Sequence, residues 1–336
     1  MKKHLSRVGI VATLAFGLFA VLICGGQAFA VSPSSTVNNA NTLKLSPVRS
    51  DITVPAGTSA TLGVKVTNLT NAPMTIQPIE NDFIAGDERG TPALILDADK
   101  YAPTHSLKRY MVPLKNVTIP ANTVQEIKVT ITVPTNAKPG GYFGAIRFAP
   151  VASDGAQSVN LNASAASIIL MTVPGDMTEQ LSLTNFDIMQ GSKVDTLFQS
   201  ANDLHLEIRM TSSSSVQEGP FGQVSVTQRK KVVYSYDFNT QDPRDMILPD
   251  SARRWDIPLK NIGSFGNYTV HATLTYGTKN ETIDVSKSFW VIPWTVVIVA
   301  VGGALLLIAL IVGIVLGLRS YKHRLLNRHG HNGRRR

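Results

Sequence analysis

Apolar and polar residues alternate with a period of two along many short segments between residues 43 and 289. Residues 62–67, 127–133, 204–210 and 268–276 are clear examples, and Pro-, Gly- and Asn-containing turns separate such segments. This pattern is typical of half-buried strands in antiparallel sheets, which pack face to face around a core. The pattern therefore predicts an all-β region built from two tandem immunoglobulin-like β-sandwiches.

The length of this region suits two domains. We expect the first sandwich at residues 43–174 and the second at residues 175–289, divided at the turn Pro174-Gly175-Asp176. Residues 167–173 are mostly apolar, which favours a strand buried on both faces. Residues 211–219 are rich in serine and are predicted to form an exposed loop.

A different pattern begins at residue 288, since residues 288–318 contain no Asp, Glu, Lys or Arg. About 20 apolar residues in a helix cross a bilayer, so the sequence predicts a transmembrane helix at residues 290–318. Trp290 and Trp294 are expected at one membrane interface, and Arg319, Lys322 and Arg324 at the other. The basic tail 319–336 is then cytoplasmic, the chain is a single-pass type I membrane protein, and the second sandwich is the membrane-proximal one.

The N-terminus supports an extracellular location for both sandwiches. A basic start, an apolar core and the sequence Ala28-Phe29-Ala30 predict a signal peptide at residues 1–30, followed by a flexible leader at 31–42. The only cysteine, Cys24, lies in the signal peptide, and the bulky Ile23 before it argues against lipidation. A mature chain without disulfides favours a bacterial cell surface.

The net positive charge of the chain comes from the predicted signal peptide and the basic tail. Ten of the 32 Lys and Arg residues lie in the predicted signal peptide and tail, which leaves 22 bases against 23 acids outside. A nucleic-acid partner is therefore not expected. The basic tail is expected to contact anionic membrane lipid.

Residues 134–148 form a Pro-Gly-Gly turn leading into a strand in which Tyr142, Gly144, Ile146 and Phe148 share one face, with Gly144 leaving space for a neighbour. This segment resembles the end of the first extracellular domain of the WxL-interacting proteins of Gram-positive bacteria. Residues 54–58, 64–70 and 289–294 are similar to that family as well. The resemblance implies a so-called peptidoglycan-binding domain, a second immunoglobulin-like domain, a membrane anchor and a role in surface binding or adhesion.

Catalytic motifs are missing from the sequence, which has no Gly-x-Ser-x-Gly, His-Glu-x-x-His or phosphate loop. We predict no catalytic residues, no cofactor and no metal site, and His105, His205 and His271 are interpreted as ordinary strand or surface histidines. The acidic residues between 82 and 99 match no calcium loop and are interpreted as solvated turn residues. The charged residues between 242 and 254 are interpreted as a surface loop.

The best candidate for a binding surface is the irregular segment 99–113. It holds Tyr101, His105, Arg109 and Tyr110, and exposed rings beside polar groups suit a glycan. The alternative is a loop that packs over the end of the sandwich.

Three functions follow, in decreasing order of support. The first is a membrane-anchored cell-surface protein that binds peptidoglycan or a partner surface protein. The alternative is a structural or assembly factor in which an edge strand pairs with another protein. The third is a tethered hydrolase. In addition, Gly313 and Gly317 form a Gly-x-x-x-Gly motif that predicts a weak homodimer through the span.

Overall fold

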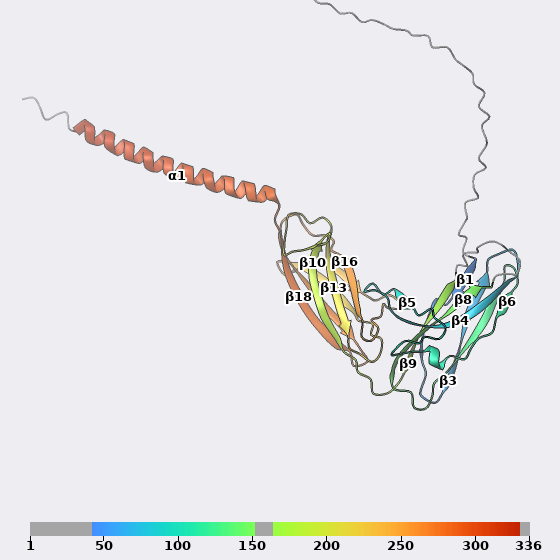
Figure 1. The fold of residues 1–336 in the computed structure, drawn as a ribbon. Coiled ribbons are helices and arrows are strands. Elements are labelled where there is room, and N and C mark those ends of the chain that lie inside the picture. The colour runs from blue at the N-terminus through green and yellow to red at the C-terminus, as the bar shows by residue number, and fades with distance from the viewer. Residues whose placement is uncertain (1–41, 152–163, 330–336) are drawn as a thin grey trace, which may run out of the picture. The chain divides into compact units, whose positions relative to one another are not determined.

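The computed structural model describes residues 42–151 and 164–329. The predicted signal peptide, the leader up to residue 41 and the tail from residue 330 lie outside the described residues, as does the side chain of Arg324. The described part is mostly β, with one C-terminal apolar helix (Figure 1).

The strands of the first half form two sheets. They are β1 (Leu43–Ser46), β2 (Arg49–Thr53), β3 (Ser59–Asn68), β4 (Met74–Ala85), β5 (Pro92–Leu94), β6 (Val117–Ile119), β7 (Val124–Thr132), β8 (Gly140–Pro150) and β9 (Ala165–Val173), with the short 3-10 helix η1 (Lys108–Tyr110) before β6. One sheet has the order β1-β3-β7 and the other β2-β9-β8-β4-β5, with β6 also paired to β4. Neighbours are antiparallel except β2 and β9, which are parallel.

The second half repeats this plan with two further sheets. Its strands are β10 (Leu181–Gln190), β11 (Lys193–Val194), β12 (Leu197–Phe198), β13 (Leu204–Ser212), β14 (Phe221–Gln228), β15 (Lys231–Phe238), β16 (Ala252–Pro258), β17 (Gly266–Tyr276) and β18 (Glu281–Val291). The sheet orders are β11-β10-β13-β16 and β12-β18-β17-β14-β15.

Each pair of sheets encloses one buried apolar cluster. In the first half the cluster contains inward-facing residues of both sheets, among them Val64, Val129, Ile146 and Phe148. A β-carbon on Gly144 would lie 2.7 Å from Met111 Cε and 3.0 Å from the Leu107 β-carbon, which confirms that this glycine leaves space for neighbours.

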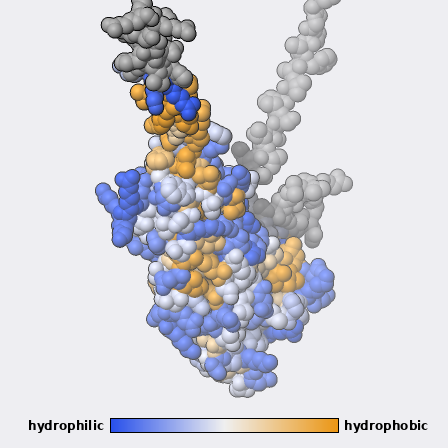
Figure 2. All heavy atoms as spheres, turned by 90° about the vertical axis from the view of Figure 1, so that its left-hand side faces the viewer, coloured by the Kyte–Doolittle hydropathy of each residue, from blue (hydrophilic) through white to orange (hydrophobic). Residues whose placement is uncertain are grey.

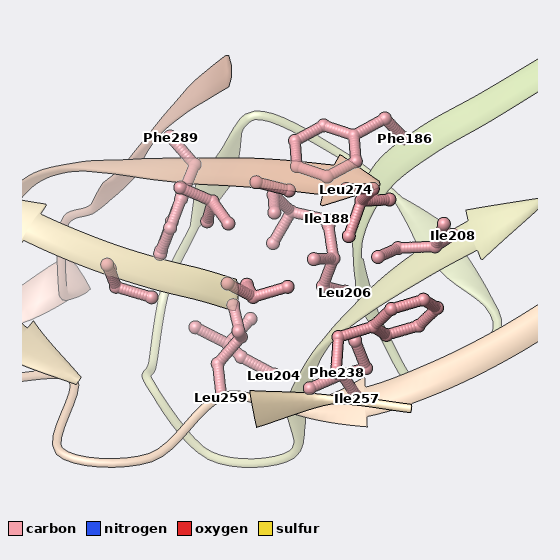
Figure 3. Packing of buried hydrophobic residues seen from close by; sticks show 14 of the residues in the cluster. Phe186, Ile188, Leu204, Leu206, Ile208, Phe238, Ile257, Leu259, Leu274 and Phe289 are labelled. Atoms are coloured by element: carbon pink, nitrogen blue, oxygen red, sulfur yellow. The ribbon is translucent and has the colours of Figure 1, made fainter. Parts of the chain in front are cut away.

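In the second half the buried cluster joins β10 and β13 of one sheet to β17 and β18 of the other. Figure 3 shows Ile188 and Leu206 of one sheet close to Leu274 of the other, and Phe289 belongs to the same buried cluster. Alternate residues along these strands point inward, so the period of two in the sequence is what builds the core.

The C-terminal helix α1 (Trp294–His329) contains one segment, Trp294–Lys322, that is long and apolar enough to cross a membrane. It starts later than the expected residue 290, because Trp290 and Val291 complete β18. Trp290 and Trp294 are 47% and 61% exposed, and Arg319 and Lys322 are exposed near the other end. On the face seen in Figure 2 the visible residues of the helix are mostly hydrophobic, and hydrophilic residues follow near its far end.

Candidate functional site

The predicted binding segment divides into an exposed part and a packed part. Tyr101 is 44% exposed, and Arg109 Cζ and Lys108 Nζ lie 4.5 Å and 4.9 Å from the centre of its ring. Tyr110 instead packs beside Tyr142, with 5.1 Å between ring centres. The structure thus brings Tyr101 and Arg109 together and separates them from Tyr110.

His105 faces the backbone of β8. Its Nδ1 lies 2.6 Å from the carbonyl oxygen of Gly141, and its ring lies 5.8 Å from that of Phe143. Its φ of 58° is in the left-handed region, which marks a backbone fixed by its surroundings. A role of Tyr101, His105, Arg109 and Tyr110 in ligand binding stays a prediction.

Asp82 is fully buried, so its interpretation as a solvated turn residue is wrong. Its carboxylate accepts hydrogen bonds from the backbone N–H of Ala102 at 2.9 Å, from Ser106 Oγ at 2.6 Å and from the backbone N–H of Lys108 at 2.8 Å. A buried carboxylate requires such donors. Asp82 therefore organises the segment that carries the predicted binding residues.

Glu88 is also not a simple turn residue, because it joins the two sandwiches. Its carboxylate accepts hydrogen bonds from Arg209 Nη2 at 2.6 Å, Arg209 Nε at 3.0 Å and Arg254 Nη2 at 3.2 Å. Its backbone carbonyl accepts from the N–H of Arg254 at 2.6 Å. The bond with Arg209 is the main cause that lowers the pKa of Glu88.

An apolar cluster lies behind these charges. Phe83, Phe143 and Leu170 of the first sandwich contact Met246 and Leu248 of the second. A cavity of about 70 Å³ remains beside them. We call this cluster and the contacts of Glu88 the sandwich junction.

Arg49 and Arg253 also belong to the sandwich junction. Arg49 donates to the carbonyl oxygen of Arg244 at 2.7 Å and pairs with Asp51. Arg253 pairs with Asp245 at 2.9 Å, and its guanidinium side chain is only 14% exposed. The interpretation of residues 242–254 as a charged surface loop is therefore wrong for Arg253.

Residues 211–219, which were expected to form an exposed loop, are largely buried, so that prediction is wrong. Ser214 and Val216 are 4% and 6% exposed. The carbonyl oxygen of Ser215 accepts from the N–H of Gly141 at 2.8 Å, and Gln217 Nε2 donates to Thr172 Oγ1 at 3.0 Å. Serine side chains are small, and here they and their backbone bond to groups that are close in space. A serine-rich segment can therefore be buried at a position that longer polar side chains would not fit.

Glu218 is an ionisable group buried in this segment. It is 3% exposed, and its Oε1 has no hydrogen-bond partner among the described residues. Burial and the neighbouring Glu179 and Glu281 raise the pKa of Glu218 to about 7. The second sandwich therefore contains a buried carboxyl group with a pKa near neutral pH.

Strand edges are the other sites where this fold can engage a partner, because an edge strand presents unpaired N–H and C=O groups. The edge of β16 is covered where Arg254 donates to Glu88. Near its end, β7 is covered by the backbone bond from Val112 to Thr130, and its outward side chains Glu126 and Lys128 are charged and exposed. Charged edges resist added strands.

No backbone bond in the described ranges covers the edge of β15, and its charged residues, Lys231 and Asp237, lie near its two ends. Within residues 42–151 and 164–329, β15 pairs only with β14. Its residues 232–236 are Val-Val-Tyr-Ser-Tyr, without a charge, and Val232 and Tyr236 are 55% and 39% exposed. No signal in the sequence distinguishes this strand from its neighbours, because edge position depends on pairing with distant strands.

β15 and β16 are end strands of the two sheets and meet on one side of the second sandwich. Phe238 on β15 contacts Trp255 on β16, with 5.2 Å between ring centres. Tyr234 and Trp255 are partly buried against the core on this side. A strand added to β15 would therefore meet aromatic rings as well as an unpaired backbone.

No group of three or more His, Cys, Asp or Glu residues in the described ranges is arranged to hold a metal ion. His205 lies on β13 and His271 on β17, as the strand patterns predicted.

No family model and no curated protein matches the sequence. Similar solved structures include the class 5 fimbriae chaperone CfaA, with 15% identity, a TM-score of 0.38 and coverage of 75% of this chain and 99% of that chain. The E. coli chaperone DraB has 15% identity, a TM-score of 0.33 and coverage of 74% and 98%. The Salmonella enterica SafA pilin in complex with the SafB chaperone has 13% identity, a TM-score of 0.33 and coverage of 73% and 95%.

These findings correct the predicted identity. Membership of the WxL-interacting protein family, and with it the predicted peptidoglycan-binding adhesin, is wrong: the structures found are fimbrial chaperones and a chaperone–pilin complex. Because the three TM-scores are all below 0.5, the function proposed below rests on the geometry of the strand edges.

Proposed function

We propose that this chain is a membrane-anchored assembly factor that holds an extended segment of a partner protein on the outer edge of β15. One observation carries the proposal. Residues 232–236 of β15 are uncharged, and within the described part of the chain they pair with β14 alone, so the side of β15 away from β14 has no backbone partner there. Strand addition of this kind uses main-chain hydrogen bonds for affinity and side-chain contacts for specificity.

The aromatic side chains between β15 and β16 determine which partner segments can bind. A strand that continues the sheet beyond β15 places every second side chain toward Tyr234, Tyr236 and Trp255. Apolar side chains at those positions bury area against the rings, so the partner segment alternates apolar and polar residues. A surface protein with an exposed strand of this pattern fits this requirement.

The proposal places the site outside the cell. The signal peptide and the basic tail support the type I orientation, with α1 as the span and both sandwiches outside. Protease added to intact cells should then cleave within the sandwiches and spare an epitope after residue 329. Protection of the sandwiches from protease would contradict this orientation.

Photo-crosslinking in intact cells tests the site itself. Benzoylphenylalanine replaces Tyr236 in one full-length variant and Val124 of β7 in a control variant, since Val124 is also an exposed edge residue, at 58%. Irradiation should yield an adduct with an envelope protein, identified by mass spectrometry, only from position 236. Adding that protein to the purified full-length chain should slow amide exchange at residues 232–236. Equal adducts at both positions, or none at 236, would overturn the proposal.

A further inference from the structure

One end of the second sandwich lies directly beside the start of α1. Gly266 pairs with Val291 at this end, and the N–H of Ile292 still bonds to the carbonyl oxygen of Phe198. Only Pro293 separates Ile292 from Trp294, the first residue of α1. Two Cα steps of 3.8 Å allow at most about 8 Å between the sheet and the helix start.

This end of the sandwich, which we call the membrane-side rim, collects the turns at residues 190–204, 228–231 and 258–267. The pairs Gln190 with Leu204 and Gln228 with Lys231 place the first two turns there. Gln228 Nε2 donates to the carbonyl oxygen of Phe265, which joins the second and third turns. The rim therefore contains segments that lie far apart in the sequence.

The membrane-side rim is basic. Its charged residues are five bases and two acids: Lys193, Arg229, Lys230, Lys231 and Lys260, with Asp195 and Asp203. All five bases are exposed, and Asp195 is partly neutralised by Lys193 at 2.9 Å. The opposite end of the same sandwich instead brings Glu179, Glu218 and Glu281 together. The second sandwich is thus polarised, with its positive end toward the helix.

Exposed apolar side chains accompany the bases. Phe265, Leu197 and Trp290 are 52%, 54% and 47% exposed. Aromatic and aliphatic side chains interleaved with lysine and arginine are typical of surfaces that lie in the headgroup region of a bilayer. A soluble face would normally not leave these side chains in water together.

The turn between β14 and β15 adds an independent observation. Arg229 and Lys230 are its two central residues and have φ values of 48° and 67°. A two-residue turn with both φ values positive favours Asn-Gly, and other residues are strained there. Basic side chains are thus kept at the rim at a cost in stability, which indicates a function for the charge.

We infer that the membrane-side rim is a lipid-contact surface that binds anionic headgroups of the bilayer in which α1 is anchored. The inference rests on the proposed membrane span. Four strands from β18 to β15 extend the rim about 14 Å sideways from the tether. The tether keeps the nearest part of the rim within about one Debye length of the headgroups, where salt screens their attraction for bases only in part.

Single-site labelling of the full-length chain in lipid nanodiscs tests this inference. In a chain with Cys24→Ser, a fluorophore is attached to Ser264→Cys at the rim, to Thr282→Cys near the other end of β18, or to Leu307→Cys in the helix. The discs contain phosphatidylcholine alone or an equimolar mixture with phosphatidylglycerol, and a headgroup nitroxide lipid or an acyl-chain nitroxide lipid serves as quencher. We expect severalfold stronger headgroup quenching at residue 264 than at residue 282, increased by phosphatidylglycerol.

The double variant Arg229→Asn, Lys230→Gly separates lipid contact from folding. It relieves the strained turn and should raise Tm, while it lowers quenching at residue 264 in anionic discs toward the level in phosphatidylcholine. Lys128→Gln in the first sandwich is the control and should change neither quantity.

Two outcomes would overturn the inference and are distinguishable. Acyl-chain quenching at residue 307 together with equal headgroup quenching at residues 264 and 282 leaves the span intact and refutes the lipid contact. No acyl-chain quenching at residue 307 refutes the span, and the rim inference fails with it. The edge function of β15 is judged separately, by the crosslinks at residue 236.

Discussion

β15 and β16 lie on the same side of the second sandwich, but the edge of β16 is covered and the edge of β15 is not in the described residues. The edge of β16 carries Arg253, Arg254 and Asp256 and is covered by Glu88 from the first sandwich. The edge of β15 is uncharged over five residues and uncovered in the described structure. Since an exposed apolar edge promotes aggregation, the contrast indicates that β15 is kept open for a partner.

The largest expected effect comes from the packing that keeps β16 covered. Phe143→Ala removes a buried ring, 3% exposed, from the sandwich junction. Loss of a buried Phe costs about 3–4 kcal/mol. Urea unfolding should show this loss, and limited proteolysis should become faster near residues 252–258. The exposed Phe265→Ala is the control, and an equal loss of stability in both variants would contradict the role of the junction.

A pH effect should follow from Glu218. Its pKa in the fold, about 7, lies above the usual 4.5. The folded chain therefore holds a proton that the unfolded chain loses, and stability falls as pH rises from 4.5 to 7. Glu218→Gln should be more stable than the parent at pH 8 by about 3 kcal/mol and nearly equal at pH 4. Tm measured across this range checks the prediction, and a gain of equal size at both pH values would refute it.

A charge on the edge of β15 should oppose pairing of a partner strand with it. Val232→Lys and Val124→Lys place the same side chain at positions of similar exposure, 55% and 58%, on β15 and β7. Binding of the partner identified by crosslinking should weaken at least about tenfold for Val232→Lys, because a lysine on the edge opposes strand pairing. Titration calorimetry with the purified full-length chain measures this. Weakening by Val124→Lys to the same extent would remove the distinction between the edges.

The smallest effect is expected at the ion pairs that cover β16. Glu88→Gln weakens the contacts with Arg209 and Arg254, which are partly exposed, and should cost about 1 kcal/mol. The loss should shrink at high salt. Glu126→Gln on β7 is the matched control and should have no measurable effect. A loss at Glu88 that is independent of salt would indicate that packing, not charge, covers the edge.

The sequence predicted the parts of this fold that depend on local pattern. Alternation at residues 62–67 and 268–276 predicted the strands that the structure has as β3 and β17. The uncharged run that starts at residue 288 predicted the helix α1. Residues 211–219 were predicted incorrectly, because their serines are satisfied by backbone that is distant in sequence.

The candidate site could not be predicted for the same reason. The open edge of β15 is defined by the absence of a neighbour, and the covered edge of β16 by Glu88, more than 160 residues away. Neither property is present in the local sequence. Asp82 and Glu88 were likewise misread as solvated, because a carboxylate in a turn pattern does not reveal the donors that the fold brings to it.

The single residue between Ile292 and α1 also has a mechanical consequence. A partner that pulls on the second sandwich transmits its force to α1 through β18, with no slack chain to extend first. β18 is paired with β17 over all eleven of its residues. Tension along β18 loads these pairs together in shear instead of opening them one by one. The sheet next to the helix can therefore serve as a stiff coupling between an external load and the membrane.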